Sequence, residues 1–322
     1  MRITAFVPAI LLGACLVSCG KVKVEDVTGV SVKTTDVTVY YTSAEFSGKV
    51  TSPAPLKEIK FFYGTNKSNL SQSSSNVSPS SDGTVLVTVS NLEDGQEYFY
   101  QLVAYVGKTP VKGEVKDFVT FVEGPVDLDL PSGKKWASHN LGAKYPTEKG
   151  EYYAWGETKP KEVYDWSTYK YCQGDYRTLT KYTTGTANSA DKTADKITEL
   201  ERSDDAATAN LGSSWHTPTL KEWVELNDNC VVTEKNINGV RGLIIRSKKD
   251  QSNNKKFIFI PSNPGICRGN NFEGNRSIYW TASLDDNNDI VGRVVTLSLG
   301  YIMTTGSTSY RSDGLPVRAI SD

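Results

Sequence analysis

The sequence predicts an all-β sandwich followed by an α+β domain. Three observations favour this order. Short runs of Val, Thr, Tyr and Phe, separated by turn residues, fill the first third of the chain, and the one clear helical pattern comes later. The chain also holds 17 Tyr, 10 Phe and 6 Trp but only 2 Met, and aromatic residues favour the pleated, half-buried surface of a sheet. With 322 residues, it is long enough for two domains and a leader.

The charge and motif content argues against several classes of partner. Lys and Arg number 36 and Asp and Glu 37, which gives a formal net charge of -1. Nucleic-acid-binding proteins normally carry a basic surplus on one face, so we expect no nucleic acid partner. With 2 His and no phosphate-loop, zinc-protease or nucleophile-elbow motif, we expect neither a metal nor another cofactor.

Residues 1–18 have the pattern of a lipoprotein signal peptide. Arg2 precedes an apolar run that is too short for a spanning helix. The run ends in LVSC at 16–19, which resembles a bacterial lipobox. This resemblance implies an acylated Cys19 and attachment to the bacterial outer membrane through lipid alone, facing the cell surface. The alternative is an ordinary secretory peptide with a chance cysteine.

Residues 19–27 are expected to be a charged tether, and residues 28–122 a sandwich. Short strands at intervals of 8–12 residues with no helical period are typical of antiparallel sandwiches. Gly124-Pro125 marks the boundary to the second domain, residues 123–322, because this pair ends regular strand pairing. The expected strands are 28–34, 44–51, 57–64, 69–77, 83–90, 97–107 and 112–121.

The segment LEDGQEY at 92–98 resembles the L-x-P-G-x-x-Y pattern of fibronectin type III domains. The resemblance implies that Tyr98 bonds back to the loop before its strand, as a tyrosine corner does. Asp94 replaces the usual proline. Alternation along the strand places Tyr98, Tyr100 and Leu102 on one face.

In the second domain, residues 217–229 predict a helix. Thr219 and Glu222 have the spacing of a capping box, and Leu220 and Trp223 begin an apolar stripe. A weaker helical pattern runs through 191–201. The expected strands are 240–246, 256–260, 278–283, 291–299 and 315–320.

Several motifs of the second domain occur together in one known family. They are DLDLPSGKKWASHNLGAKYPTEKGEYYAWGE at 127–157, DDAATANLGSSWHTPTLKEW at 204–223, YWTAS at 279–283 and RSDGLPVRAI at 311–320. In this order they resemble the major paralogous domain family first described in Fibrobacter. The resemblance implies a C-type-lectin-like scaffold, not a reaction. We expect its aromatic residues to build the core and Arg318, Asp204 and Asp205 to form internal ion pairs.

Polar and aromatic residues concentrate at 267–280, 285–289 and 300–314. Such residue types combine adaptable hydrogen bonds with rigid aromatic area, and loops of this kind often bind ligands. We therefore expect a non-catalytic binding face for a glycan or protein; a polar surface without a ligand is the alternative. The expected ligand-binding residues are Asn270, Asn271, Arg276, Asp285, Asn288, Tyr301, Tyr310 and Arg311.

Two other functions stay open. Glu151 and Glu157 flank a YYAW segment and would serve a cell-surface glycan hydrolase if they faced one cleft. A structural role in a fimbria or surface layer is the third hypothesis. Cys172, Cys230 and Cys267 allow at most one disulfide, whose pairing the sequence leaves open.

Replacing Cys19 with Ser removes the thiol that would carry the lipid. We expect Cys19→Ser to move the protein from the membrane fraction to the soluble fraction, because acyl burial contributes about 0.8 kcal/mol per methylene. Fractionation and immunoblotting measure this, with Cys172→Ser as the control that stays with membranes. Retention of Cys19→Ser on membranes would contradict the lipid anchor.

Overall fold

The computed structural model describes residues 26–249, 256–262, 265–267, 270–271, 277–298 and 300–322. Strands dominate, and the helices are short: α1 (Ala206–Leu211), α2 (Leu220–Asn229) and two turns of 3-10 helix, η1 (Tyr176–Thr178) and η2 (Arg202–Asp204). Within these ranges, no helix has the length and hydropathy needed to cross a bilayer. The predicted signal peptide and Cys19 lie outside the described residues.

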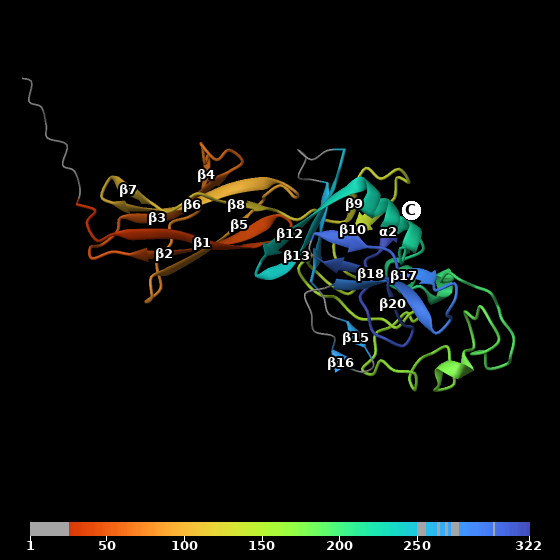
Figure 1. The fold of residues 1–322 in the computed structure, drawn as a ribbon. Helices are drawn as coiled ribbons and strands as arrows, with labels where there is room; N and C mark the ends of the chain where they lie inside the picture. Colours follow the sequence, from red (N-terminus) through yellow and green to blue (C-terminus); the bar gives the residue numbers. More distant parts are fainter. Residues whose placement is uncertain (1–25, 250–255, 263–264, 268–269, 272–276, 299) are drawn as a thin grey trace, which may run out of the picture.

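The first part of the chain is a sandwich of two antiparallel sheets (Figure 1). One sheet consists of β1 (Ser31–Val39), β2 (Ser43–Thr51) and β5 (Thr84–Ser90). The other consists of β4 (Gln72–Ser73), β3 (Glu58–Gly64), β6 (Glu97–Val106), β7 (Thr109–Lys112) and β8 (Lys116–Val119). The predicted strand at 69–77 shrinks to β4, because the Ser74 hydroxyl and the Asn76 side chain, instead of a ladder, accept hydrogen bonds from the β3 backbone.

The sandwich core confirms the alternation expected along β6. Tyr98, Tyr100 and Leu102 are all buried, and Phe46 stacks on Tyr100 with the ring centroids 4.8 Å apart. The Tyr98 hydroxyl accepts a hydrogen bond of 3.0 Å from the backbone N–H of Glu93. This bond ties the strand to the loop before it.

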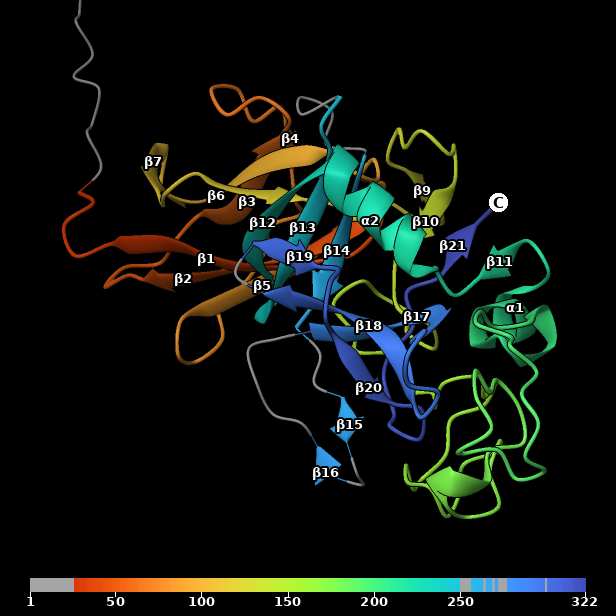
Figure 2. The same cartoon turned by 45° about the vertical axis from the view of Figure 1, so that its right-hand side comes forward.

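The rest of the chain forms three further sheets and a small hairpin (Figure 2). The first sheet contains β9 (Pro125–Asp127), β10 (Lys135–Ala137), β11 (Trp215–His216) and β21 (Ile320–Ser321). The second contains β12 (Cys230–Ile237), β13 (Val240–Ser247) and β14 (Phe257–Pro261). The third contains β17 (Ser277–Leu284), β18 (Val291–Ser298), β19 (Tyr301–Met303) and β20 (Thr308–Tyr310), and β15 (Ile266–Cys267) pairs with β16 (Asn270–Asn271).

Helix α2 begins where the sequence predicts. Thr219 is its N-cap, and the side chains of Thr219 and Glu222 form both halves of a capping box. Trp223 and Leu226 on its buried face pack in one core with Tyr279 of β17 and residues of β18. Capping and burial therefore favour the same helix.

The helix predicted at 191–201 is wrong. Lys192 and Lys196 adopt positive φ values of 64° and 58°, which an α-helix does not tolerate. The Asp195 carboxylate accepts hydrogen bonds from the backbone N–H groups of Tyr182 and Thr183. Asp195 Oδ1 also accepts a bond from the backbone N–H of Ile197, and a local side-chain bond of that kind competes with a helix.

The other strands of the second part match their predicted ranges with small shifts at their ends, except 315–320. Residues 315–320 are buried, but their carbonyl groups accept hydrogen bonds from four different residues. These are Tyr153, Trp280, Leu141 and Ala137. No single partner strand runs beside this segment, so only Ile320 belongs to a strand. The hairpin β12–β13 was not predicted, although Asn238-Gly239 at its turn is a strong hairpin signal.

The same hairpin joins the two parts of the chain. The Asn238 side chain exchanges two hydrogen bonds with the backbone of Val39, of 2.7 and 2.8 Å. Ile237 and Phe259 belong to the sandwich core cluster. Nearby, the Tyr41 hydroxyl lies 3.0 Å from Nδ1 of His139, and burial lowers the pKa of this histidine.

Glu222 supports a prediction about acid stability. Burial alone would raise its pKa, but hydrogen bonds from His216, Lys134 and Thr219 outweigh burial and hold the pKa at about 2, against an ordinary value of 4.5. The ionised carboxylate therefore stabilises the fold above pH 4.5, and this contribution is lost as the pH falls toward 2.

We expect Glu222→Gln to lower the free energy of unfolding at pH 7 by about 1–3 kcal/mol. The difference from the unaltered protein should shrink between pH 5 and pH 2. Urea unfolding across this pH range measures it. Glu225→Gln, on the same helix, is the matched control, because Glu225 accepts one backbone hydrogen bond from Ser132 that the amide oxygen retains. An equal pH dependence in both variants would contradict the assignment.

Candidate ligand-binding cleft

The predicted binding residues fall into different environments. Tyr301 on β19 and Asn288 in the loop before β18 are exposed. Asn270 and Asn271 form β16, and Arg276 lies outside the described residues. Asp285 is nearly buried and forms an ion pair of 3.1 Å with Arg293, so internal charge pairing occupies a carboxylate expected on the binding face.

The structure contradicts the prediction that Arg311 binds a ligand. Arg311 was expected on the exposed face, but its side chain is completely buried. Its guanidinium donates to the hydroxyl of Tyr169 (2.9 Å) and to the carbonyls of Tyr182 (3.1 Å), Asp289 (2.9 Å) and Lys181 (2.9 Å). These acceptors satisfy the planar donor fork of arginine inside the protein, so Arg311 is not available to a ligand.

The bonds of Arg311 join two loop segments that are far apart in the sequence. Tyr169, Lys181 and Tyr182 belong to the long segment before α1, whereas Asp289 precedes β18. The guanidinium also lies 5.1 Å from the ring of Trp155, a distance at which a cation is attracted to an aromatic face. Arg311 therefore holds these segments together where regular strand pairing does not.

An open cleft of about 370 Å³ lies where these segments meet. Its walls are Asp165, Trp166, Tyr176, Ile290, Tyr310 and Ser312. The Trp166 ring centroid is 6.1 Å from both the Tyr176 centroid and the Tyr310 centroid. Three aromatic side chains thus converge on one hollow, and Tyr310 is the predicted binding residue that lines it.

Internal contacts position Trp166. The Cys172 thiol donates to the Trp166 carbonyl at 3.1 Å, and the buried Tyr169 ring packs edge-on against the indole at 5.5 Å. The Asp165 Oδ1 atom accepts bonds from the backbone N–H and hydroxyl of Ser167. Cys172 and Cys230 are free thiols, so these two cysteines do not form a disulfide with each other.

Tyr176 sits at the start of η1. The Asp175 side chain caps this turn by accepting a bond from the backbone N–H of Arg177. Asp175 and Arg177 also form an ion pair of 2.8 Å, and the Arg177 guanidinium lies 5.3 Å from the Tyr176 ring. The turn therefore presents the ring at the edge of the cleft.

Asp165, Trp166 and Tyr176 were not among the predicted site residues. The available signal was the density of aromatic residues in YDWSTYKYCQGDYRTLTKY at 164–182. Four of the six rings in this segment, Tyr169 and Tyr182 among them, are buried in the core. The pattern alone does not separate core rings from cleft rings.

Internal hydrogen bonds engage one of the two carboxylates weighed for a hydrolase. Glu157 is buried, and its Oε1 atom accepts bonds from Lys161 Nζ (2.9 Å) and the Lys170 backbone N–H (2.8 Å). Glu151 is exposed. Across the described part of the chain, no three potential His, Cys, Asp or Glu ligands cluster as a metal site would require.

The expected ion pairs of the motif residues are confirmed only in part. Asp204 pairs with Lys170 and Lys181. Asp205 instead caps α1 through its side chain. Arg318 is completely buried and donates to Asn140 and to backbone carbonyls, and no described carboxylate pairs with it.

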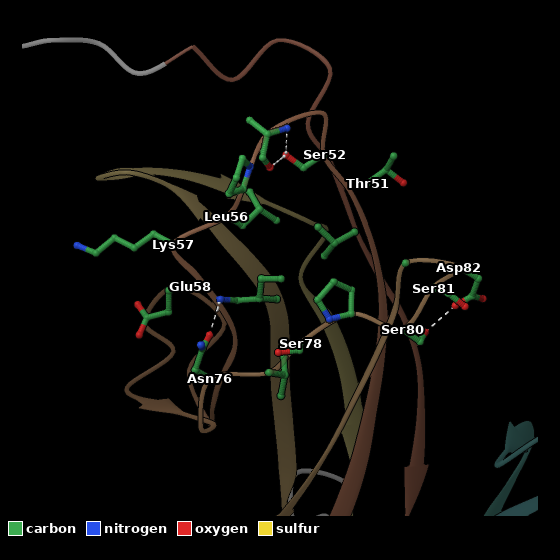
Figure 3. Close-up of a pocket in the computed structure, with 17 residues that line it drawn as sticks. Thr51, Ser52, Leu56, Lys57, Glu58, Asn76, Ser78, Ser80, Ser81 and Asp82 are labelled. Atoms are coloured by element: carbon green, nitrogen blue, oxygen red, sulfur yellow. Dashed lines mark hydrogen bonds between the residues drawn. The ribbon is translucent and has the colours of Figure 1, made fainter.

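A larger hollow of about 530 Å³ lies on the sandwich, between the segments 50–59 and 76–83 (Figure 3). Its polar side chains serve their own loops. Asn76 accepts from the Ile59 backbone, and the Ser80 hydroxyl donates to Asp82. No aromatic ring lines it, so it lacks the flat apolar area that distinguishes the cleft.

No protein-family model and no curated protein sequence matches this chain. Among solved structures, it is similar to a short form of the sensor domain of the anti-sigma factor RsgI4 in Pseudobacteroides cellulosolvens, at 18% identity over 30% of this chain and 98% of that one, with a TM-score of 0.25. It is also similar to a computationally redesigned β-sandwich protein, at 22% identity over 28% and 90%, with a TM-score of 0.22. Scores this low carry no argument about function.

The Tyr169 hydroxyl supports a prediction about the cleft scaffold. It donates to the Trp155 carbonyl at 2.8 Å and accepts from Arg311. Tyr169→Phe leaves both groups unsatisfied in the interior, so we expect a loss of about 1–3 kcal/mol in unfolding free energy. Tyr176→Phe, which removes an exposed hydroxyl, is the control and should change stability by less than about 0.5 kcal/mol. Equal stability of the two variants, measured by urea unfolding, would contradict the role of the Tyr169 hydroxyl.

Proposed function

We propose that this chain is a lipid-anchored, non-catalytic protein that binds a glycan in the cleft formed by Trp166, Tyr176 and Tyr310. The observation that carries the proposal is the convergence of three aromatic rings on an open hollow. Binding sites combine apolar and aromatic walls with a few polar groups that fix orientation. The apolar faces of sugar rings suit flat aromatic walls of this kind.

The proposed scaffold of this site is a C-type-lectin-like domain of the major paralogous type, spanning 123–322. Its support lies in the motifs and in where their residues sit. Trp136, Trp155 and Trp280 of these motifs are buried. Strands β10 and β21 are paired, which puts the first and last motifs side by side. The cleft residues Trp166 and Tyr176 lie between motifs, where a common scaffold leaves room for variation.

The proposed role of residues 28–122 is that of a fibronectin type III-like spacer. The bond between Tyr98 and Glu93 supports it, as does the division of strands into β1-β2-β5 and β4-β3-β6 with β7 and β8. With residues 19–27 as a tether and Cys19 as the lipid attachment site, the spacer would raise the cleft away from the outer membrane at the cell surface.

A glycan array probed with the full chain in detergent tests the proposal. We expect binding to a subset of glycans, weakened about tenfold or more by Trp166→Ala and by Tyr310→Ala, because truncation of central aromatic residues typically costs more than 1 kcal/mol. Tyr301→Ala is the matched control, since Tyr301 is exposed and does not line the cleft.

Two results would count against the proposal. One is the absence of binding to a broad glycan panel by a folded sample. The other is binding that Trp166→Ala and Tyr310→Ala leave unchanged. Turnover of a chromogenic glycoside that Glu157→Gln abolishes would favour the hydrolase hypothesis.

A further inference from the structure

The wall of the cleft carries an acidic side chain and no basic one. Among the six wall residues, Asp165 is the only carboxylic acid, and none is Lys, Arg or His. The Ser167 hydroxyl bond, helped by backbone N–H groups, lowers the pKa of Asp165. The wall therefore carries a negative charge at neutral pH.

The cations near the cleft already have partners: Arg177 and Lys161 form ion pairs, and Arg311 donates hydrogen bonds to neutral groups. Arg177 pairs with Asp175, and Lys161, which also lowers the pKa of Asp165, pairs with Glu157 at 2.9 Å. Arg311 below the cleft donates to carbonyls and to Tyr169. These contacts leave the negative charge of Asp165 without an ion-pair partner among the described residues.

One oxygen of Asp165 remains open to a ligand. Oδ1 accepts the bonds from Ser167 and from the Thr168 backbone, whereas Oδ2 accepts none from the described residues. The same wall carries three aromatic rings, whose faces attract cations. A carboxylate beside convergent rings is complementary to a ligand that is both cationic and partly apolar.

We infer that the cleft prefers a glycan with a protonated amine, an amino sugar, over the same glycan with that nitrogen acetylated. This inference rests on the proposed glycan-binding function and adds the charge of its ligand. The amine would lie against Asp165, and the sugar ring would lie against the aromatic walls.

Two oligosaccharides that differ only in the acetylation of this nitrogen, and therefore in its charge, provide the test: the β-1,4-linked hexamer of glucosamine and the hexamer of N-acetylglucosamine. We expect the full chain in detergent to bind the glucosamine hexamer about tenfold more tightly by calorimetry, because hydrogen bonds between charged groups are the stronger ones. Raising the salt from about 0.05 to about 0.5 M should weaken only that binding, since salt screens exposed charges.

Asp165→Asn should abolish the preference and leave the affinity for the acetylated hexamer within about twofold. The amide oxygen of Asn retains the Ser167 bonds, and Asp165→Ser is a second variant if Asn disturbs the loop. Asp286→Asn is the matched control, because this exposed carboxylate lies outside the cleft and its loss changes the net charge equally.

Equal affinity for the two hexamers, or a preference that survives both Asp165 substitutions, would overturn the inference. Binding of neutral glycans alone, lost in Trp166→Ala, would also overturn it but would leave the proposed function standing. If no glycan binds on the array or in calorimetry, the proposed function fails and the inference fails with it.

Discussion

The arrangement of the cleft depends on the buried guanidinium of Arg311. Transfer of a charge into a protein interior is costly unless hydrogen bonds satisfy it. Here three backbone carbonyls and one tyrosine hydroxyl supply those bonds, and they come from segments without regular strand pairing. Because these acceptors must meet at one group, the segments that carry Trp166 and Tyr310 are brought together. Arg318 does the same between Asn140, Ala137 and Phe259, and burial lowers its pKa.

Local patterns were sufficient to predict the elements that local interactions stabilise. The capping box at Thr219 and Glu222 and the alternation through Tyr98 and Tyr100 lead directly to α2 and β6. The segment 191–201 resembles a helix by composition, but Asp195 bonds to a backbone 12 residues away. Residues 315–320 resemble a strand, yet their backbone bonds go to three separate stretches of the chain, at 137–141, 153 and 280. Such long-range partners leave no periodic signal.

The predicted binding residues also divide into those that composition identifies and those that depend on long-range partners. Polar and aromatic composition identified the region of Tyr310, which lines the cleft, and of Tyr301, which is exposed. It also selected Arg311 and Asp285, because composition cannot show whether a charged side chain finds its partners inside the protein. Trp166 and Tyr176 come from a segment more than a hundred residues earlier in the chain, and only the folded structure, in which the bonds of Arg311 join the two segments, places them beside Tyr310.

Hydrogen–deuterium exchange of the full chain with Arg311→Lys tests this account most directly. Lysine keeps the charge but lacks the planar fork that reaches four acceptors. The account predicts that amides in 166–182 and 288–310 lose protection together, while those of the sandwich strands between 31 and 119 do not change. Unchanged protection in both cleft segments, or an equal loss throughout the chain, would contradict it.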